Sequence, residues 1–277
     1  MNVVGIGTPG CHLAKNFENL PQYKVFYIDS EKRDYDNFIK VTPEATHEEY
    51  EENYKVNDFS CIVGDTTVIF SGAGNISGII LRLLEQLRQN NLTILYIKPD
   101  FSSLSKDSRI RDKITFGILQ QYARSNLFSR IYIVNNKNIE SVLGDLSISS
   151  YWKDINSVIS STYHMMNVFK NSEPLLTTFS PINETSKIAT FGVVGFDSFK
   201  EKLFYDLKSA RIKRYFFGVN EETLEKDKDL LHRIRKFTQN RSNDDVGVSF
   251  SIYPTEYERN YIYCAYYASL IQEEIIS

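Results

Sequence analysis

Cysteine and histidine are scarce in this sequence, and each shortage argues against a class of protein. Its 277 residues include three cysteines, Cys11, Cys61 and Cys264, which lie far apart and form no CxxC pair. This pattern argues against a disulfide-stapled secreted domain and is typical of reduced thiols in a cytoplasm. The four histidines show no HExxH or Cys/His spacing, so we predict no metal site built from them.

Long apolar runs and an excess of one charge are also absent. Thirty-two basic against 35 acidic residues give a net charge of −3, which supplies no field for wrapping nucleic acid. The N-terminus lacks the features of a signal peptide, and the apolar runs are short and broken by charge. We therefore expect a cytoplasmic protein whose main partner is neither a membrane nor a nucleic acid.

Short β-rich runs alternate with stretches of helical period over the first 150 residues. The runs are Val3–Ile6, Lys24–Ile28, Thr67–Ser71, Thr93–Lys98 and Arg130–Val134. They are apolar almost throughout, as in strands covered on both faces of a parallel sheet. Apolar helix stripes are predicted at Ile79, Ile80, Leu83, Leu84 and Leu87, and at Ile114, Ile118, Leu119 and Tyr122. The pattern predicts an α/β domain over residues 1–150.

The rest of the chain differs in pattern. A long helix is predicted over Trp152–Phe169, and loop signals place a boundary between about 171 and 187. The elements expected after it are a strand at Ile188–Phe196, a helix at Ser198–Ser209, a strand at Arg214–Val219, a helix at Glu221–Thr238, and strands at Val246–Tyr253 and Tyr261–Ala268 joined by a polar turn. We predict a central helix and connecting loop over 151–187 and a smaller α+β domain over 188–277.

A glycine loop, Gly5-Ile6-Gly7-Thr8-Pro9-Gly10, follows the first strand and opens a helix. Glycines let backbone N–H groups approach an anion, and a helix N-terminus adds about half a positive charge. Gly7, Thr8 and Gly10 are therefore candidate phosphate ligands. Asp29 ends the second strand, near the spacing at which an acid binds a ribose hydroxyl in a dinucleotide-binding fold. The alternative is a tight turn without a ligand.

A second loop, Ser71-Gly72-Ala73-Gly74-Asn75-Ile76-Ser77-Gly78, follows the strand that begins near Asp65. Two such loops at the carboxyl ends of neighbouring strands would place two helix N-termini around one polyphosphate. The candidate phosphate ligands here are Gly72, Gly74, Ser77 and Gly78. The alternative is a helix cap formed by Asn75 or Ser77.

These loops resemble those of the tubulin/FtsZ superfamily of filament-forming GTPases. The second loop matches the signature GGGTGTG at its three glycines, with Ser77 in place of a threonine and Ile76 in place of a glycine. Lys98-Pro99 is similar to the KP dipeptide that ends the equivalent FtsZ strand, and Asn135-Asn136-Lys137 is similar to the PNDK turn.

The long helix carries the same resemblance, since Trp152 to Ile159 looks like the family's FxxxNDVL. This implies that Trp152 stacks on a guanine and that Asn156 reads its edge, with Asp29 and Asn135 beside the ribose and base. Ser157 replaces the family's aspartate and cannot offer two acceptors to guanine. The alternative for Trp152 is packing in a core.

The family's catalytic loop, NxDxxD/E, corresponds to Asn183-Glu184-Thr185-Ser186-Lys187, in which Glu184 is the remaining carboxylate. The resemblance thus implies GTP or GDP, with Mg²⁺, bound between subunits of a head-to-tail homo-oligomer or filament in which hydrolysis is weak or lost. The compact length, with no long acidic tail after the last strand, resembles the tubulin-like proteins of phages and plasmids, which would place the protein in a host cytoplasm.

Two charged patches could meet between subunits or could be solvated faces. The acidic patch comprises Glu44, Glu48, Glu49, Glu51 and Glu52, and the basic patch comprises Lys208, Arg211, Lys213 and Arg214. Two other functions stay open. One is a Rossmann-type NAD(P)-dependent oxidoreductase that uses the first loop and Asp29. The other is a structural or scaffold protein of the tubulin fold that binds no nucleotide.

Overall fold

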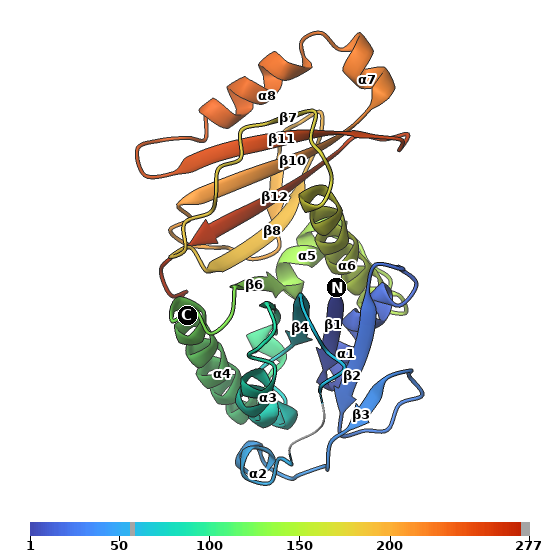
Figure 1. The fold of residues 1–277 in the computed structure, drawn as a ribbon, viewed down its shortest axis with the longest axis vertical. Coiled ribbons are helices and arrows are strands. Elements are labelled where there is room, and N and C mark those ends of the chain that lie inside the picture. The colour runs from blue at the N-terminus through green and yellow to red at the C-terminus, as the bar shows by residue number, and fades with distance from the viewer. Residues whose placement is uncertain (56–58, 273–277) are drawn as a thin grey trace. The chain divides into compact units, whose positions relative to one another are not determined.

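Parallel strands form one sheet in the first part of the chain, in the order β3-β2-β1-β4-β5-β6 (Figure 1). The computed structural model describes residues 1–55 and 59–272. Its strands here are β1 (Asn2–Ile6), β2 (Lys24–Asp29), β3 (Phe38–Lys40), β4 (Thr66–Phe70), β5 (Leu92–Lys98) and β6 (Arg130–Asn135). The chain divides into two units, Met1–Ser160 and Ser161–Ser277, and this sheet belongs to the first.

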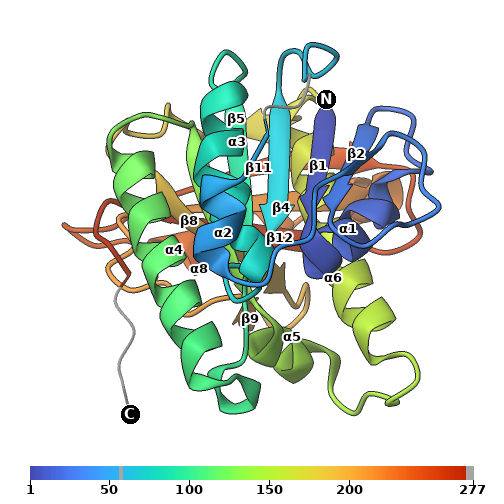
Figure 2. The ribbon, with the colours of Figure 1, turned by 90° about the horizontal axis from the view of Figure 1, so that it is seen from below.

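The strands predicted from apolar runs are confirmed to within one residue at either end. β3 was not predicted because it is three residues long and only half-buried. The helices of the first unit are α1 (Gly7–Ala14), η1 (Lys15–Phe17), α2 (His47–Glu52), η2 (Asn75–Ile79), α3 (Ile80–Gln86), η3 (Phe101–Ser103), α4 (Lys106–Arg124) and α5 (Asn136–Leu143). α3 and α4 lie side by side in both views (Figures 1 and 2).

The predicted stripe on α3 is buried throughout, whereas the stripe on α4 is only partly right. Ile114 is 53% exposed, and the buried face consists of Thr115, Phe116, Leu119 and Ala123. Phe116 stacks on Tyr96 of β5, with ring centroids 5.2 Å apart, and this contact sets the rotation of the helix. An aromatic pair across helix and sheet thus outweighs the burial of one isoleucine.

α6 (Tyr151–Lys170) confirms the long helix, and the division between the two units falls within it. Ile155, Ile159, Tyr163 and Met166 are buried along one face, but Trp152 at the start of the helix is 61% exposed. The interpretation of Trp152 as a core residue is therefore wrong.

The second unit contains mixed strands in the order β8-β12-β10-β11-β7, and β9 pairs with β8. Its strands are β7 (Leu176–Thr177), β8 (Ile188–Val194), β9 (Glu201–Leu203), β10 (Ile212–Asn220), β11 (Gly247–Thr255) and β12 (Tyr261–Ala268). β11 and β12 are consecutive in the chain but do not pair, because β10 lies between them, parallel to β11 and antiparallel to β12.

One helix prediction in this unit is wrong, and another is right only in part. Part of the segment Ser198–Ser209 is β9, whose Lys202 carbonyl approaches β8 so closely that a Cβ on Gly192 would lie 2.3 Å from it. The predicted helix Glu221–Thr238 is broken into α7 (Glu221–Lys226) and α8 (Leu230–Gln239). The break occurs where the Asp227 side chain accepts a hydrogen bond from the backbone N–H of Asp229, a turn that competes with the helix.

Over residues 1–55 and 59–272, no helix combines the length and the apolarity needed to cross a lipid bilayer. The prediction that no long tail follows the last strand concerns residues 273–277, which lie outside the described part of the chain.

Candidate functional site

The strand order reverses between β1 and β4, and ligands of open α/β sheets bind beyond the carboxyl ends of the strands at such a point. Both glycine loops lie there. Gly7 opens α1 directly after β1, and Ser71–Gly78 follows β4. A Cβ on Gly7 would lie 2.9 Å from the Cγ2 atom of Ile76, so the two loops touch. The parallel register of β1 and β4 brings them together, since both strands end at the same edge.

Backbone donors without acceptors line this edge. Ile6, the N-cap of α1, provides no side-chain hydrogen bond, and the first turn of α1 contains no acid. Among the described residues, the N–H groups of Gly72, Ala73 and Gly74 find no acceptor. Unpaired N–H groups beside a helix N-terminus attract an anion. The edge can therefore bind phosphate or carboxylate groups.

Three of the predicted phosphate glycines are required by packing within the protein. A Cβ on Gly10 would lie 2.2 Å from the Ile69 carbonyl oxygen, one on Gly72 would lie 2.3 Å from the Tyr96 hydroxyl, and one on Gly78 would lie 2.2 Å from the His47 carbonyl oxygen. Gly74 is exposed, and its Cβ position has only Ile76 within 4.0 Å. Gly74 is therefore the glycine whose surroundings leave room for a ligand.

The polar side chains of the second loop are used inside it. The Ser77 hydroxyl lies 2.9 Å from the Gly72 carbonyl oxygen and 2.7 Å from that of Gly74, so it donates to the loop's own backbone. Asn75 donates from Nδ2 to the Ala45 carbonyl oxygen, at 2.8 Å. Neither side chain caps the helix η2, and both brace the loop.

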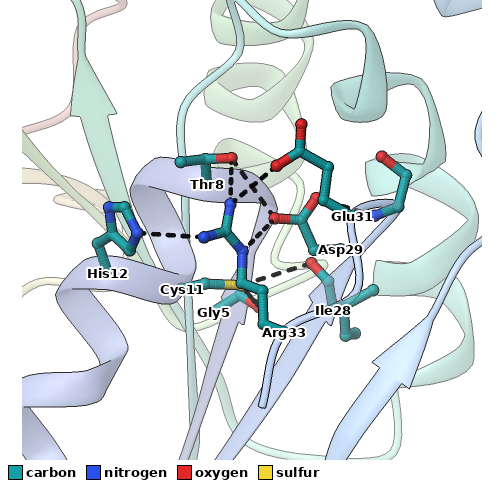
Figure 3. A network of polar contacts seen from close by, with 9 residues as sticks. Gly5, Thr8, Cys11, His12, Ile28, Asp29, Glu31 and Arg33 are labelled. Carbon is teal, nitrogen blue, oxygen red and sulfur yellow. Dashed lines mark hydrogen bonds and ion pairs between the residues drawn. The ribbon is translucent and has the colours of Figure 1, made fainter. Parts of the chain in front are cut away.

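Arg33, which the sequence analysis missed, stands beside the first loop (Figure 3). Its Nε atom lies 3.0 Å from Oδ2 of the buried Asp29, and its Nη2 atom donates to the Thr8 hydroxyl at 2.7 Å. The Ser30 N–H donates to the other Asp29 oxygen, at 2.8 Å. Asp29 therefore has both oxygens occupied by the protein. Asp29 ends β2 and Arg33 lies in the loop after it, so the i, i+4 rule for helices gave no signal for this pair.

Two titratable side chains of α1, Cys11 and His12, have pKa values shifted toward their neutral forms. Burial raises the pKa of Cys11 to about 12, and its thiol donates to the Gly5 carbonyl oxygen at 3.4 Å. Burial, followed by the charge of Arg33, lowers the pKa of His12, whose Nε2 atom lies 3.3 Å from Arg33 Nη1. The cation next to the first loop is thus Arg33, which pairs with the carboxylates of Asp29 and, at 3.4 Å, Glu31.

A buried ion pair lies beneath the second loop. Lys98 Nζ is 2.5 Å from Asp112 Oδ2, and the Tyr96 hydroxyl donates to Asp112 Oδ1 at 2.6 Å. Burial raises the pKa of Asp112, and Lys98 and Tyr96 oppose that rise. Lys98 therefore acts in packing and does not reach a ligand. Arg111 of α4, also missed from the sequence, donates from Nε to the Ala73 carbonyl oxygen at 3.2 Å and places a second cation at this loop.

The predicted base and ribose residues differ in their availability. Trp152 is exposed in the first turn of α6, with Tyr151 edge-on at 4.9 Å between ring centroids. Asn156 is half-buried one turn further along. The Asn135 side chain accepts a hydrogen bond from the Lys137 N–H, at 2.8 Å, and so caps α5. Trp152 and Asn156 are free to meet a ligand, whereas Asn135 is occupied.

Glu184 belongs to the second unit, where it is exposed in a turn held by a hydrogen bond from the Thr185 N–H to Asn183 Oδ1, at 3.2 Å. No group of three or more histidines, cysteines or acids in the described residues could hold a metal ion. Mg²⁺ binds through carboxylates and substrate phosphates, and the carboxylate nearest the first loop, Asp29, is committed to Arg33. These residues do not fit a magnesium site.

Two hollows of the first unit flank α2, and neither is lined by a glycine-loop residue. One, of about 140 Å³, is lined by Lys40, Tyr50 and Lys55 among others, and one of about 480 Å³ includes Glu51 and Arg82. We place the candidate site by its unpaired donors, because an open sheet edge binds anions without enclosing them.

No protein-family model and no curated protein matches the sequence. Solved structures match in fold. CetZ2 from Haloferax volcanii, in a GTPγS-bound protofilament, has a TM-score of 0.71 at 14% identity, over 96% of this chain and 92% of that one. A GTPγS-form protofilament of TubZ from Bacillus thuringiensis serovar israelensis has a TM-score of 0.69 at 14% identity, over 97% and 87%. An empty FtsZ dimer from M. jannaschii has a TM-score of 0.65 at 11% identity, over 96% and 87%. These matches confirm the predicted fold class.

Proposed function

We propose, from the tubulin/FtsZ superfamily fold of this chain and the two glycine loops that meet at its strand-order reversal, that it is a filament-forming protein that binds a guanine nucleotide. The observation that carries the proposal is the set of unpaired N–H groups at Gly72–Gly74 beside the uncapped N-terminus of α1. The solved structures that are similar to this chain include GTPγS-form and GDP-form protofilaments of TubZ, which supports the same class of ligand here.

Different residues bind the phosphates and the base of the nucleotide. The N–H groups of both loops bind phosphates, and Arg33 and Arg111 add positive charge at either loop. Trp152 stacks on the base, and Asn156 hydrogen-bonds its edge. Gly10, Gly72 and Gly78 keep the loops in place through close packing.

Hydrolysis is slow in this proposal, and the nucleotide acts mainly as an interface ligand. Glu184 of a neighbouring copy is the carboxylate of the catalytic-loop segment, with no second acid after it. The lack of a fitting magnesium site removes a further source of charge stabilisation. We expect turnover to be far below that of an efficient GTPase. The protein would act in a cytoplasm, which is that of the host if a phage encodes the chain.

Assembly is head to tail, with the acidic patch of one copy facing the basic patch of the next. The acidic residues Glu51 and Glu52 are exposed on α2. The basic patch is partly engaged within its own unit, since Arg211 pairs with Asp245 at 2.7 Å and Lys213 lies over the Tyr266 ring. The patches therefore steer association more than they hold it.

The single tryptophan gives a direct test. Because Trp152 is exposed, base stacking should quench its fluorescence, and titration with GDP, GTP, ATP and NADP⁺ compares the ligand classes. We expect saturable quenching by the guanine nucleotides, and weaker GDP binding by Trp152→Ala in calorimetry, which needs no tryptophan signal. Quenching by NADP⁺ alone would favour the oxidoreductase. The nucleotide-free scaffold would be favoured by no quenching, no nucleotide released on denaturation, and filaments that ignore nucleotide in sedimentation and negative-stain microscopy.

A further inference from the structure

Ile76 fills the space between the two glycine loops. Its Cγ2 methyl group lies 2.9 Å from the Cβ position of Gly7 and 4.0 Å from that of Gly74. Gly7 has a φ of +64°, so its backbone turns toward the methyl group in a conformation that suits glycine. The two glycines thus accommodate a branched side chain that is itself half-exposed.

The space between the Gly7 backbone and the Ile76 methyl group is too narrow for another carbon atom, since even a Cβ on Gly7 would clash with that methyl group. Carbon atoms in contact lie about 3.5–4.0 Å apart, and a phosphate oxygen between Gly7 and Ile76 would need roughly twice that gap. A phosphate chain that used the donors of both loops would have to pass through this space. With the space filled, such a chain binds at one loop and loses the donors of the other.

The loop segment that carries Ile76 is held by hydrogen bonds on both sides of this residue. Ile76 is flanked by Asn75, which donates to the Ala45 carbonyl oxygen, and by Ser77, whose hydroxyl donates to the loop carbonyls. Shifting the loop backbone to carry Ile76 away from Gly7 would break these hydrogen bonds, which cost roughly 1 kcal/mol each when lost. We therefore expect Ile76 to keep its position when a ligand binds, and the ligand to bind around it.

We propose that Ile76 limits the length of the phosphate chain that the site accepts, so that a nucleoside diphosphate binds more tightly than the triphosphate. The inference rests on the proposed function, because it presumes a nucleotide whose base is fixed at Trp152. The phosphates are then counted outward from the base. The terminal phosphate of a triphosphate would lose its hydration without gaining hydrogen-bond donors from the protein. Because that phosphate is charged, this loss disfavours binding.

The test compares GDP and GTP affinities, by Trp152 fluorescence and by calorimetry, for the native chain, Ile76→Gly and the control Ile148→Gly. Ile148 is an exposed isoleucine in a loop, so its replacement removes the same side chain away from the site. We expect GDP to bind the native chain at least tenfold more tightly than GTP. We expect Ile76→Gly to raise GTP affinity at least tenfold and Ile148→Gly to change neither affinity. Circular dichroism checks that the variants fold.

The possible outcomes separate this inference from the proposed function. Nucleotide binding with the same GDP-to-GTP ratio in the native chain and Ile76→Gly overturns this inference and leaves the proposed function standing. Binding of GTP by Ile76→Gly alone supports the steric role of Ile76 and overturns native nucleotide binding. Binding of neither nucleotide to any of the three proteins overturns both proposals.

Discussion

Arg33 is the residue on which the charge of the candidate site depends most, because it stands beside the first glycine loop and the histidine next to it is neutral. Its guanidinium is held by Asp29 and Thr8, so it is oriented before any ligand arrives. Pre-oriented donors lose less entropy when they bind an anion.

Arg33→Gln should weaken GDP binding about tenfold, which corresponds to about 1.4 kcal/mol. The reason is the loss of one charge-assisted contact at the first loop. Fluorescence titration of Trp152 measures the affinity, and Lys32→Gln is the matched control, because it removes the same charge from the neighbouring exposed position. Equal weakening by both variants would mean that general charge, and not a directed contact, is responsible.

Residue chemistry was predicted from sequence only where a backbone pattern marks it. The glycine loops and the tryptophan were visible because strand, loop and helix signals flank them. Arg33, Arg111 and the Lys98–Asp112 pair were not predicted as a set. The contacts of Arg33 with Thr8, of Arg111 with the Ala73 carbonyl and of Lys98 with Asp112 each join residues at least 14 positions apart in the chain. Side-chain partners of this kind are set by packing and leave only weak signals in local spacing.

At the scale of elements, the glycines decide how closely α1 can approach the sheet. Gly10→Ala places a Cβ 2.2 Å from the Ile69 carbonyl oxygen and should destabilise the fold by about 3 kcal/mol. Gly74→Ala has open space and should cost less than about 1 kcal/mol. Urea unfolding of the two variants measures the difference. If both cost the same, close packing at Gly10 is not what requires a glycine there.

The buried ion pair between β5 and α4 makes a second element-scale prediction. Asp112→Asn leaves Lys98 charged and uncompensated in the interior and should cost about 3–5 kcal/mol. The double variant Lys98→Met, Asp112→Leu removes both charges and should lie within about 2 kcal/mol of the native chain. Chemical denaturation measures all three proteins. A double variant less stable than Asp112→Asn would show that the pair itself is the source of stability.

Helices and strands were predicted well from the sequence where a strand is buried on both faces of a sheet, and poorly elsewhere. The strands of the parallel sheet are covered on both faces and read as apolar runs. β9 and the break between α7 and α8 depend on a close backbone approach at Gly192 and on a single aspartate turn, which periodicity does not report. Tertiary contacts override local propensity at both places.

For the whole molecule, the charged patches predict how assembly depends on sequence and salt. Glu51→Lys with Glu52→Lys should raise the critical concentration for sedimentation about tenfold, because it reverses the charge that attracts the basic patch. The matched control is Asp34→Lys with Asp36→Lys, which makes the same change of net charge at exposed positions of the first unit. Restoration of assembly by mixing with a chain carrying Lys208→Glu and Arg211→Glu would identify the facing patch. An unchanged critical concentration would remove the acidic patch from the interface.

The sheet order of the second unit also governs when it can fold during synthesis. β12 lies between β8 and β10, and it is the last strand of the described residues. Until Ala268 has left the ribosome, β8 and β10 each present an unpaired edge, which is prone to pairing with another chain. The strands of the first unit are complete by Asn135, so that unit can fold while the rest is still being made. A nascent chain halted before Tyr261 would therefore need chaperone protection for its second unit alone.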